Sequence, residues 1–382
     1  MNNNLNHKHI IALDGLRGMA VLFVMIYHFN FIDKISHTVP DNIFNYIISA
    51  GWIGVDLFFV LSGFLITGIL ISNKGKSNYF ISFYYRRTLR IFPLYYLYLI
   101  LLFVFFYPFI VSRVDAVEVQ KIHFTQSIQV WFWTYLSNIK QGIDGTFSTA
   151  GSSHLWSLAI EEQFYLIWPF IVFITSVKQL KNISIIVIIL SLLLRIYLYF
   201  IGWSAQSIYI FTFTRIDSLA FGSLIATLIR SGYVIPYKKF TYVFYGLLIC
   251  LLIIFCFFDT DYHRSPIIYL FSFTLLGATF GVLVLLLQSS DSFKFPLKSI
   301  FLKRGLVFLG KYSYALYIFH PFVRFALAKV MGRPKLFYNS EILWQLFFFA
   351  LCFLLSIIIA QLSWHLYEKH FLKLKDRFFL KR

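Results

Sequence analysis

Residues 10–31 read IIALDGLRGMAVLFVMIYHFNF, an apolar stretch interrupted by Asp14, Arg17 and His28. A membrane-spanning helix needs about 20 mostly apolar residues, and this stretch is long enough. A cleavable signal peptide has a shorter apolar core followed by a small-residue cleavage site, and the stretch has neither feature. It therefore predicts a first transmembrane helix that carries ionisable side chains inside the membrane.

Composition extends this prediction to the whole chain. The 382 residues are 59% hydrophobic, 21% aromatic and only 13% charged, and the mean hydropathy is +0.74. An ordinary soluble domain is roughly 45–50% apolar and about 25% charged. A soluble globule of the present composition would expose large apolar patches and aggregate. Composition thus excludes a soluble enzyme, a disordered regulator and a disulfide-stapled secreted domain.

The hydropathy pattern predicts an all-α membrane protein, a polytopic bundle of about ten transmembrane helices. The expected spans cover residues 10–31, 51–72, 91–111, 155–175, 183–201, 213–229, 240–258, 266–288, 305–327 and 342–364. A shorter aromatic segment, 128–139, contains Trp131, Trp133 and Tyr135 and has about half the length of a span. We expect it to be re-entrant or to lie at the outer interface, where Trp and Tyr are enriched.

The net charge of +18 indicates the orientation of the bundle. Lys and Arg accumulate in short cytoplasmic loops. A cytoplasmic N-terminus places the basic loop 73–90 inside. If segment 128–139 does not cross, the basic tail 369–382 is inside as well. We therefore expect both termini to be cytoplasmic, in a multi-pass protein of the inner (cytoplasmic) membrane that contacts membrane lipids. The basic excess then does not call for nucleic acid as a partner.

Ionisable side chains inside spans are costly, so each is a functional hypothesis. Arg17 and His28 are 11 positions apart, so at 100° per residue they share one face of the first span. Their separation along the helix axis is ~16 Å, from a rise of 1.5 Å per residue. The alternative is that Arg17 pairs with Asp14 at the inner end and His28 lies at the outer interface.

Three carboxylates fall in the outer halves of later spans, Asp56, Glu161 and Glu162. Adjacent residues do not face each other on a helix, so only one of the two glutamates can face a given site. A buried carboxyl group beside a second one is a plausible proton carrier. Near Asp56, Gly54 and Gly63 would permit close approach of another helix.

Other polar residues in the spans leave two interpretations open. Arg215 and Asp217 form either an ion pair or part of a site, and His320 is either a site residue or an interface residue. Arg195, near the middle of its span, needs a counter-charge, which either adjacent glutamate in the span 155–175 could supply.

Arg86, Arg87 and Arg90 directly precede the third span at the predicted inner face. The first interpretation is that they orient the helix and contact anionic lipids. The second is that they clamp a phosphate, because the guanidinium fork matches phosphate geometry.

These residues carry a family resemblance. Its pieces, in order, are LDGLRGMAVLFVMIYHF at 13–29, GWIGVDLFFVLSGFLIT at 51–67, FYYRRTLRIFPLYYL at 83–97, LWSLAIEEQFYLIWP at 155–169, TRIDSLAFG at 214–222, GKYSYALYIFHP at 310–321 and YEKHFLKLKDRF at 367–378. Together they resemble acyltransferase family 3, the integral membrane acyltransferases that modify cell-envelope and exported carbohydrates. The resemblance covers residues 8–380 as one transmembrane domain, and we expect no additional soluble domain.

The resemblance implies an O-acyltransferase that uses acyl-CoA, most often acetyl-CoA, as donor and no metal. The acceptor is a hydroxyl of a carbohydrate, free or lipid-linked: an O-antigen sugar, an exopolysaccharide, peptidoglycan, a secreted glycolipid or a small molecule. For such a reaction we expect His28 at the thioester as general base or acyl carrier, Glu161 or Glu162 to orient it or handle the proton, and Asp56 as a competing orienting group; these four are the expected catalytic residues. We expect Arg17, Arg87 and Arg90 to bind the phosphates of the donor, and Ser157, Arg215, Asp217 and His320 to bind substrate.

Two other classes of membrane protein remain as alternatives. A transporter or flippase of polysaccharide precursors would use the buried charges as a substrate or proton path, but it commonly shows repeated halves and broken helices, which this sequence lacks. An enzyme of glycan polymerisation or ligation would use a lipid-linked sugar and would not need arginines at the inner face.

Overall fold

In the computed structural model, the described residues are 10–30, 38–148, 151–289, 293, 295–332 and 340–379, and every element assigned within them is helical. The helices are α1 (Ile11–Phe29), α2 (Val39–Ser49), α3 (Ile53–Asn73), α4 (Tyr79–Ile100), α5 (Tyr107–Ile110), α6 (Ala116–Ser127), α7 (Gln129–Trp133), α8 (Ser137–Asp144), α9 (Leu155–Ile174), α10 (Val177–Phe200), α11 (Ala205–Ile210), α12 (Thr212–Arg230), α13 (Tyr237–Phe258), α14 (Phe273–Leu287), α15 (Lys298–Phe301), α16 (Arg304–Lys311), α17 (Ser313–Met331), α18 (Ile342–Ser363) and α19 (Lys369–Phe379).

The all-α membrane architecture is confirmed. Within the described part of the chain, nine helices or runs of consecutive helices are long and apolar enough to cross a membrane. They match nine of the expected spans. The remaining one, 305–327, is divided at Tyr312 into the short helix α16 and the 19-residue helix α17. Residues 1–9 and 380–382, which include both chain ends, lie outside the described residues.

Local sequence signals account for several helix ends. The hydroxyl of Ser176 accepts the Gln179 backbone N–H, and the Gln179 side chain accepts the Ser176 N–H, a capping box that begins α10. Asp115 caps α6 in a similar way. Pro93, Pro169 and Pro321 lie inside helices. Membrane-spanning helices tolerate proline because neighbouring helices and polar side chains satisfy the freed backbone groups.

Segment 128–139 forms no spanning helix, as the sequence predicts. It contains the five-residue helix α7, a turn at Tyr135 with a left-handed φ of 55°, and the start of α8. The segment is held against α4, because Tyr95 donates a hydrogen bond of 2.8 Å to the Phe132 carbonyl and Tyr135 stacks on Tyr95 at 4.1 Å. This region therefore packs on the bundle without adding a span.

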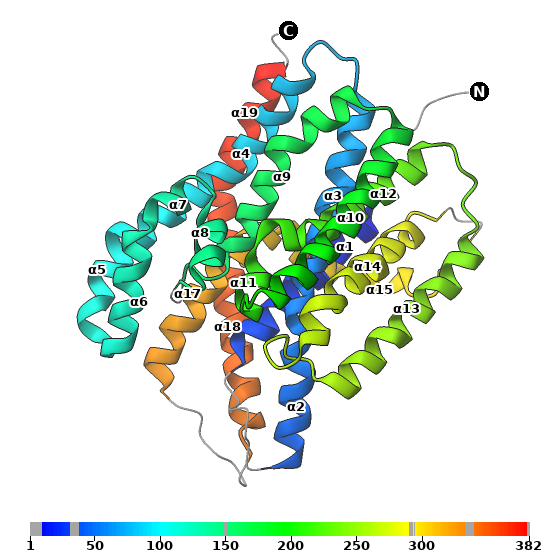
Figure 1. The fold of residues 1–382 in the computed structure, drawn as a ribbon. Helices are drawn as coiled ribbons and strands as arrows, with labels where there is room; N and C mark the ends of the chain where they lie inside the picture. The colour runs from blue at the N-terminus through cyan, green and yellow to red at the C-terminus, as the bar shows by residue number, and fades with distance from the viewer. Residues whose placement is uncertain are drawn as a thin grey trace.

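Helices differ strongly in how much of their surface the bundle covers. In the apolar stretch that contains α12, 72% is buried inside the molecule, whereas in the apolar stretch of α13 only 11% is buried. Figure 1 shows α13 at one edge of the molecule and α5 and α6 at the opposite edge. Of the ionisable residues predicted as functional, Asp56, Arg215, Asp217 and His320 are buried, whereas Arg90 is exposed.

Glycine allows the central helices α3 and α12 to pack backbone against backbone. A Cβ atom at Gly63 would overlap the Leu219 carbonyl oxygen, and one at Gly222 would overlap the Val60 carbonyl oxygen. Small residues at such crossings are typical of membrane helix packing. The predicted close approach at Gly63 is confirmed, and it brings Asp56 on α3 within reach of α12.

Glycine also allows α1 and α16 to pack backbone against backbone. A Cβ atom at Gly18 would overlap the Leu306 carbonyl oxygen, and one at Gly310 would overlap the Asp14 carbonyl oxygen. The two backbones are therefore in direct contact beside Arg17. This contact positions the N-terminal half of α1 against the element that leads into α17.

The packing of α3 on α12 yields a stability prediction. We expect Gly63→Ala to lower the free energy of unfolding by about 1–3 kcal/mol, because the added methyl group meets fixed backbone. Thermal unfolding of the purified protein in detergent measures the effect. Gly68→Ala on the same helix is the matched control, because a Cβ there meets nothing within 4 Å. Replacing a glycine by alanine inside a helix without a clash is stabilising by roughly 0.5–1 kcal/mol. An equal response of the two variants would contradict the proposed close packing.

Candidate active site

A cavity of about 1410 Å³ lies among α1, α3, α4, α9, α12, α16 and α17, and residues between Trp364 and Leu372 also line it. Six cationic side chains line it: Arg17, Arg87, Arg90, Arg230, Arg304 and Lys311. Three carboxylates line it: Asp14, Glu161 and Glu368. The lining formed by the described residues therefore has a cationic excess, which favours an anionic ligand.

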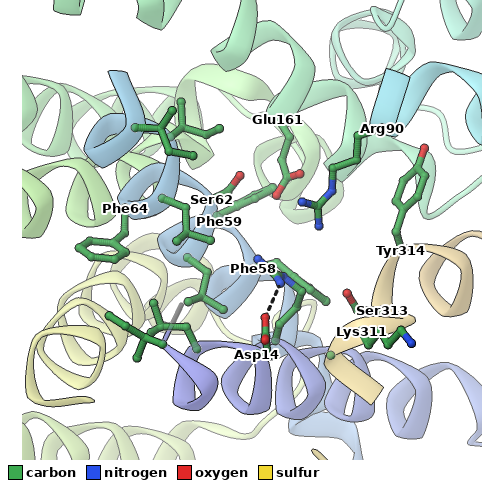
Figure 2. A pocket seen from close by; sticks show the side chains of 18 of the residues that line it. Asp14, Phe58, Phe59, Ser62, Phe64, Arg90, Glu161, Lys311, Ser313 and Tyr314 are labelled. Carbon is green, nitrogen blue, oxygen red and sulfur yellow. Dashed lines mark hydrogen bonds and ion pairs between the residues drawn. The ribbon is translucent and has the colours of Figure 1, made fainter. Parts of the chain in front are cut away.

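The three predicted donor-binding arginines all reach this cavity. Arg17 on α1 forms an ion pair of 3.1 Å with Asp14, the local pairing that the sequence also allowed. Arg87 on α4 lies over the ring of Tyr165 at 5.2 Å. Figure 2 shows Arg90 from α4 and Glu161 from α9 pointing into the same space, with Asp14 on the opposite wall.

The structure distinguishes the two adjacent glutamates. Glu161 lines the cavity and accepts a hydrogen bond of 3.1 Å from the Tyr165 hydroxyl, which also hydrogen-bonds Ser62 on α3. Glu162, one residue on along the helix, is not among the residues that line the cavity. Of the two carboxyl groups, Glu161 is the one that faces the cationic space.

A hydroxyl pair marks the end of the cavity towards the start of α9. Ser157 on α9 and Tyr317 on α17 both line the cavity, and their hydroxyl groups hydrogen-bond each other. The Tyr317 hydroxyl also lies 3.1 Å from the His154 carbonyl oxygen. Ser157, predicted to bind substrate, therefore lies one helical turn from Glu161, ~6 Å along the axis.

Beyond Tyr317 lie three histidines. Nδ1 of His28 is 3.0 Å from Nε2 of His320, and the two rings are 4.9 Å apart. The ring of His154 packs on His320 at 5.5 Å and on Tyr317 at 5.5 Å. The Tyr317 ring, 5.8 Å from that of His320, connects this group with the cavity wall. Among the described residues, no group of three or more His, Cys, Asp or Glu side chains is arranged to hold a metal ion.

His154 was not among the site residues predicted from the sequence. Its only signal was its position directly before the LWSLAIEEQFY stretch, at the same predicted outer level as His28. A histidine just outside an apolar segment is typical of the membrane interface. The structure shows instead that the His154 side chain is only 1% exposed.

Asp56, Arg215 and Asp217 lie in the core and not in the cavity wall. Arg215 on α12 donates from Nη2 to both carboxylate oxygens of Asp56, each at 2.9 Å, and Ser218 donates to the same carboxylate at 2.9 Å. Asp217 pairs with Arg195 on α10 at 2.9 Å. All four charged side chains are fully buried.

The prediction that Glu161 or Glu162 supplies the counter-charge of Arg195 is therefore wrong. The sequence offered Glu161 or Glu162, but the partner is Asp217, and Arg195 also donates to the Leu270 carbonyl oxygen at 2.9 Å. Helix α10 packs on α12, so the nearest carboxylate comes from that helix and not from α9. Arg215 and Asp217, two residues apart, point to different neighbours and do not form the mutual pair that the sequence allowed.

Comparisons with known proteins agree with this architecture. The sequence model of a family described as an acyltransferase domain matches residues 10–361, so the tail motif at 367–378 lies beyond it. Peptidoglycan O-acetyltransferase OatA of Listeria monocytogenes is 30% identical over 379 residues, 95% of this chain and 56% of its own length. A Bacillus subtilis protein provisionally named peptidoglycan O-acetyltransferase YrhL is 29% identical over 381 residues, 95% of this chain and 55% of its own length.

A third relative, provisionally named O-acetyltransferase SACOL0978 of Staphylococcus aureus, is 29% identical over 384 residues, 96% of this chain and 58% of its own length. The chain thus spans little more than half the length of these curated relatives. No solved structure matches.

The buried pair between Asp56 and Arg215 yields a second stability prediction. We expect Asp56→Ala to lower the free energy of unfolding by about 3–5 kcal/mol, because it leaves a buried guanidinium without its counter-charge. Unfolding in detergent is again the measurement. Asp144→Ala is the control, since its ion pair with Lys140 is partly exposed and such pairs contribute only about 0–1 kcal/mol. A loss at Asp56 no larger than that at Asp144 would show that the core does not depend on this pair.

Proposed function

Because this chain belongs to acyltransferase family 3, we propose that it is a membrane O-acetyltransferase. It moves an acetyl group from cytoplasmic acetyl-CoA to a hydroxyl group of a cell-envelope carbohydrate. The membrane is the cytoplasmic membrane, with both termini on the cytoplasmic side.

The observation that carries the proposal is the cationic cavity. Coenzyme A carries phosphate groups at one end and the thioester at the end of a long, thin arm. Arg17, Arg87 and Arg90 line one cavity together with three further cations, and arginine matches phosphate geometry well. A cavity that only contacted lipid headgroups would have no need to extend inward to Ser157 and Tyr317.

The separation of Arg17 and His28 along α1 suits the same donor, although His28 lies behind the cavity wall and not in its lining. Arg17 and His28 are ~16 Å apart along the axis of α1, from the rise per residue. With its phosphates at the arginines, the donor would extend its arm past Glu161 to the Ser157–Tyr317 end of the cavity. The thioester would then lie close to the histidine group behind Tyr317.

His28 is the residue we propose at the reacting atoms. In direct transfer it takes the proton of the acceptor hydroxyl while the oxygen attacks the thioester carbonyl carbon. The new C–O bond replaces the C–S bond, and the proton ends on the coenzyme A thiol. In the covalent alternative, His28 first accepts the acetyl group and then passes it to the hydroxyl. Glu161 assists the proton transfer, and Glu162 and Asp56 support the fold around it.

For the acceptor, we propose a peptidoglycan-type glycan as the first choice. Two of the relatives carry that substrate in their names. The O-antigen and exopolysaccharide acceptors suggested by the broader family are then the alternatives to test. Mass analysis of envelope glycans from cells with and without the protein, comparing acetylated with unacetylated sugars, identifies the acceptor.

The donor site gives the third prediction. We expect Arg87→Ala combined with Arg90→Ala to raise the apparent KM for acetyl-CoA roughly 10-fold or more, because a hydrogen bond to a charged group contributes about 1.5–3 kcal/mol. Steady-state transfer by the purified protein is the assay. Arg86→Ala is the control, since Arg86 lies in the same basic stretch and is not among the cavity-lining residues. An unchanged KM in the double variant would remove these arginines from the phosphate site.

The histidine gives the fourth prediction. We expect His28→Ala to reduce acetyl transfer by at least about 100-fold, the scale of a lost general acid–base group, while the thermal midpoint of the folded protein changes little. The control is His365→Ala, since His365 is exposed and its Nδ1 atom lies 2.8 Å from the Gln361 carbonyl oxygen, one turn earlier in the chain. Wild-type protein that moves a glycan across vesicles without consuming acetyl-CoA would instead favour the flippase alternative.

A further inference from the structure

His320 on α17 contacts two groups that decide where its ring proton lies. Its Nδ1 atom is 3.1 Å from the Leu316 carbonyl oxygen and 2.9 Å from the Tyr317 carbonyl oxygen. A carbonyl oxygen only accepts hydrogen bonds, so Nδ1 must carry a proton to satisfy either contact. In a neutral imidazole the other ring nitrogen is then an acceptor. The backbone of α17 therefore makes Nε2 of His320 an acceptor.

That acceptor faces His28. Nε2 of His320 lies 3.0 Å from Nδ1 of His28, and the same Nδ1 lies 3.0 Å from the Val24 carbonyl oxygen. Both neighbours accept, so Nδ1 of His28 is the donor. The proton of a neutral His28 is thereby held on Nδ1, and its Nε2 atom keeps a free lone pair.

We propose that His320 is a positioning residue that holds His28 in the tautomer with an unprotonated Nε2. This inference deepens the proposed function and rests on it for its catalytic consequence. Nε2 is the atom that would take the hydroxyl proton or attack the thioester. When it does, Nδ1 stays protonated and still donates to His320, so the positive charge formed on His28 has a hydrogen-bond acceptor in place. His320 itself neither gains nor loses a proton in this step.

The surroundings of His320 suit a positioning role. The side chain is fully buried, so water does not compete for its nitrogen atoms. Phe29, Tyr317 and His154 pack against its ring with centroids 6.0, 5.8 and 5.5 Å away. A ring held by packing and by two backbone carbonyls presents Nε2 to His28 in one orientation. The logic is that of a catalytic triad, in which a third group orients the base.

The tautomer can be measured without any substrate. In protein labelled with ¹⁵N-histidine, the ¹⁵N chemical shift distinguishes a protonated from an unprotonated ring nitrogen. The His28→Ala variant identifies the His28 signals by their disappearance. At a pH where His28 is neutral, we expect Nδ1 protonated and Nε2 unprotonated. A proton on Nε2 of neutral His28 in the wild-type protein overturns the inference.

Substitutions at His320 test the catalytic consequence. The amide oxygen of glutamine can take the place of Nε2 as an acceptor, whereas asparagine is too short and alanine has no acceptor. We expect His320→Ala and His320→Asn to lower kcat by about 10- to 100-fold, the range found for orienting partners of histidine ligands, with the KM for acetyl-CoA unchanged. We expect His320→Gln to retain most of the activity. A merely structural histidine would instead give equal losses in all three variants, or a change in KM, and would overturn the inference.

The two measurements separate this inference from the proposed function. If the ¹⁵N shifts show the expected tautomer in the wild-type protein and its loss in His320→Ala, but the wild-type protein transfers no acetyl group, the function is wrong and the positioning role of His320 stands. If the wild-type protein transfers acetyl groups but Nε2 of neutral His28 is protonated, the function stands and the positioning role is wrong.

Discussion

The cost of placing charge in a hydrocarbon environment organises this protein. A buried ion must either find a counter-ion or open into a polar space. Two fully buried ion pairs at 2.9 Å, Asp56 with Arg215 and Asp217 with Arg195, supply such counter-ions. Other charged side chains open into a polar space instead, because one cavity is lined by Arg17, Arg87, Arg90 and Glu161.

The charged residues thus fall into two groups, those paired in the core and those proposed to bind the donor. The paired residues lie on α3, α10 and α12, and glycine contacts hold α3 and α12 together at the backbone level. The four charged residues of the cavity lie on α1, α4 and α9, and α3 and α12 contribute further lining residues. Because the core charges are mutually neutralised, the excess of cations over carboxylates in the cavity is left to act on a ligand. That division makes the arginine cavity, and not the core arginines, the basis of the proposed donor site.

Much of the fold and part of the site could be predicted from the sequence. Span length and hydropathy predicted nine of the helical spans, since backbone hydrogen bonding in a bilayer allows few alternatives. The shared face of Arg17 and His28 followed from helix geometry alone. The division of the expected span 305–327 into α16 and α17 could not be predicted in this way, because it depends on how α16 packs backbone to backbone on α1.

The sequence could not predict which residues of distant segments contact each other. It offered Glu161 or Glu162 as the partner of Arg195, but α10 packs on α12, so Asp217 takes that place. It also gave no reason to group His28, His154 and His320, which come from three different helices or their ends.

The sequence by itself determined that the chain is a helical membrane protein with ionisable groups inside its spans. Composition and the 3.6-residue period are local properties and need no partner helix. Only the tertiary structure decided which charges neutralise each other, that Glu161 faces the cavity, and that His320 contacts His28. The physical reason is that each of these outcomes depends on a neighbour within about 3 Å, and that neighbour is set by which helices pack together.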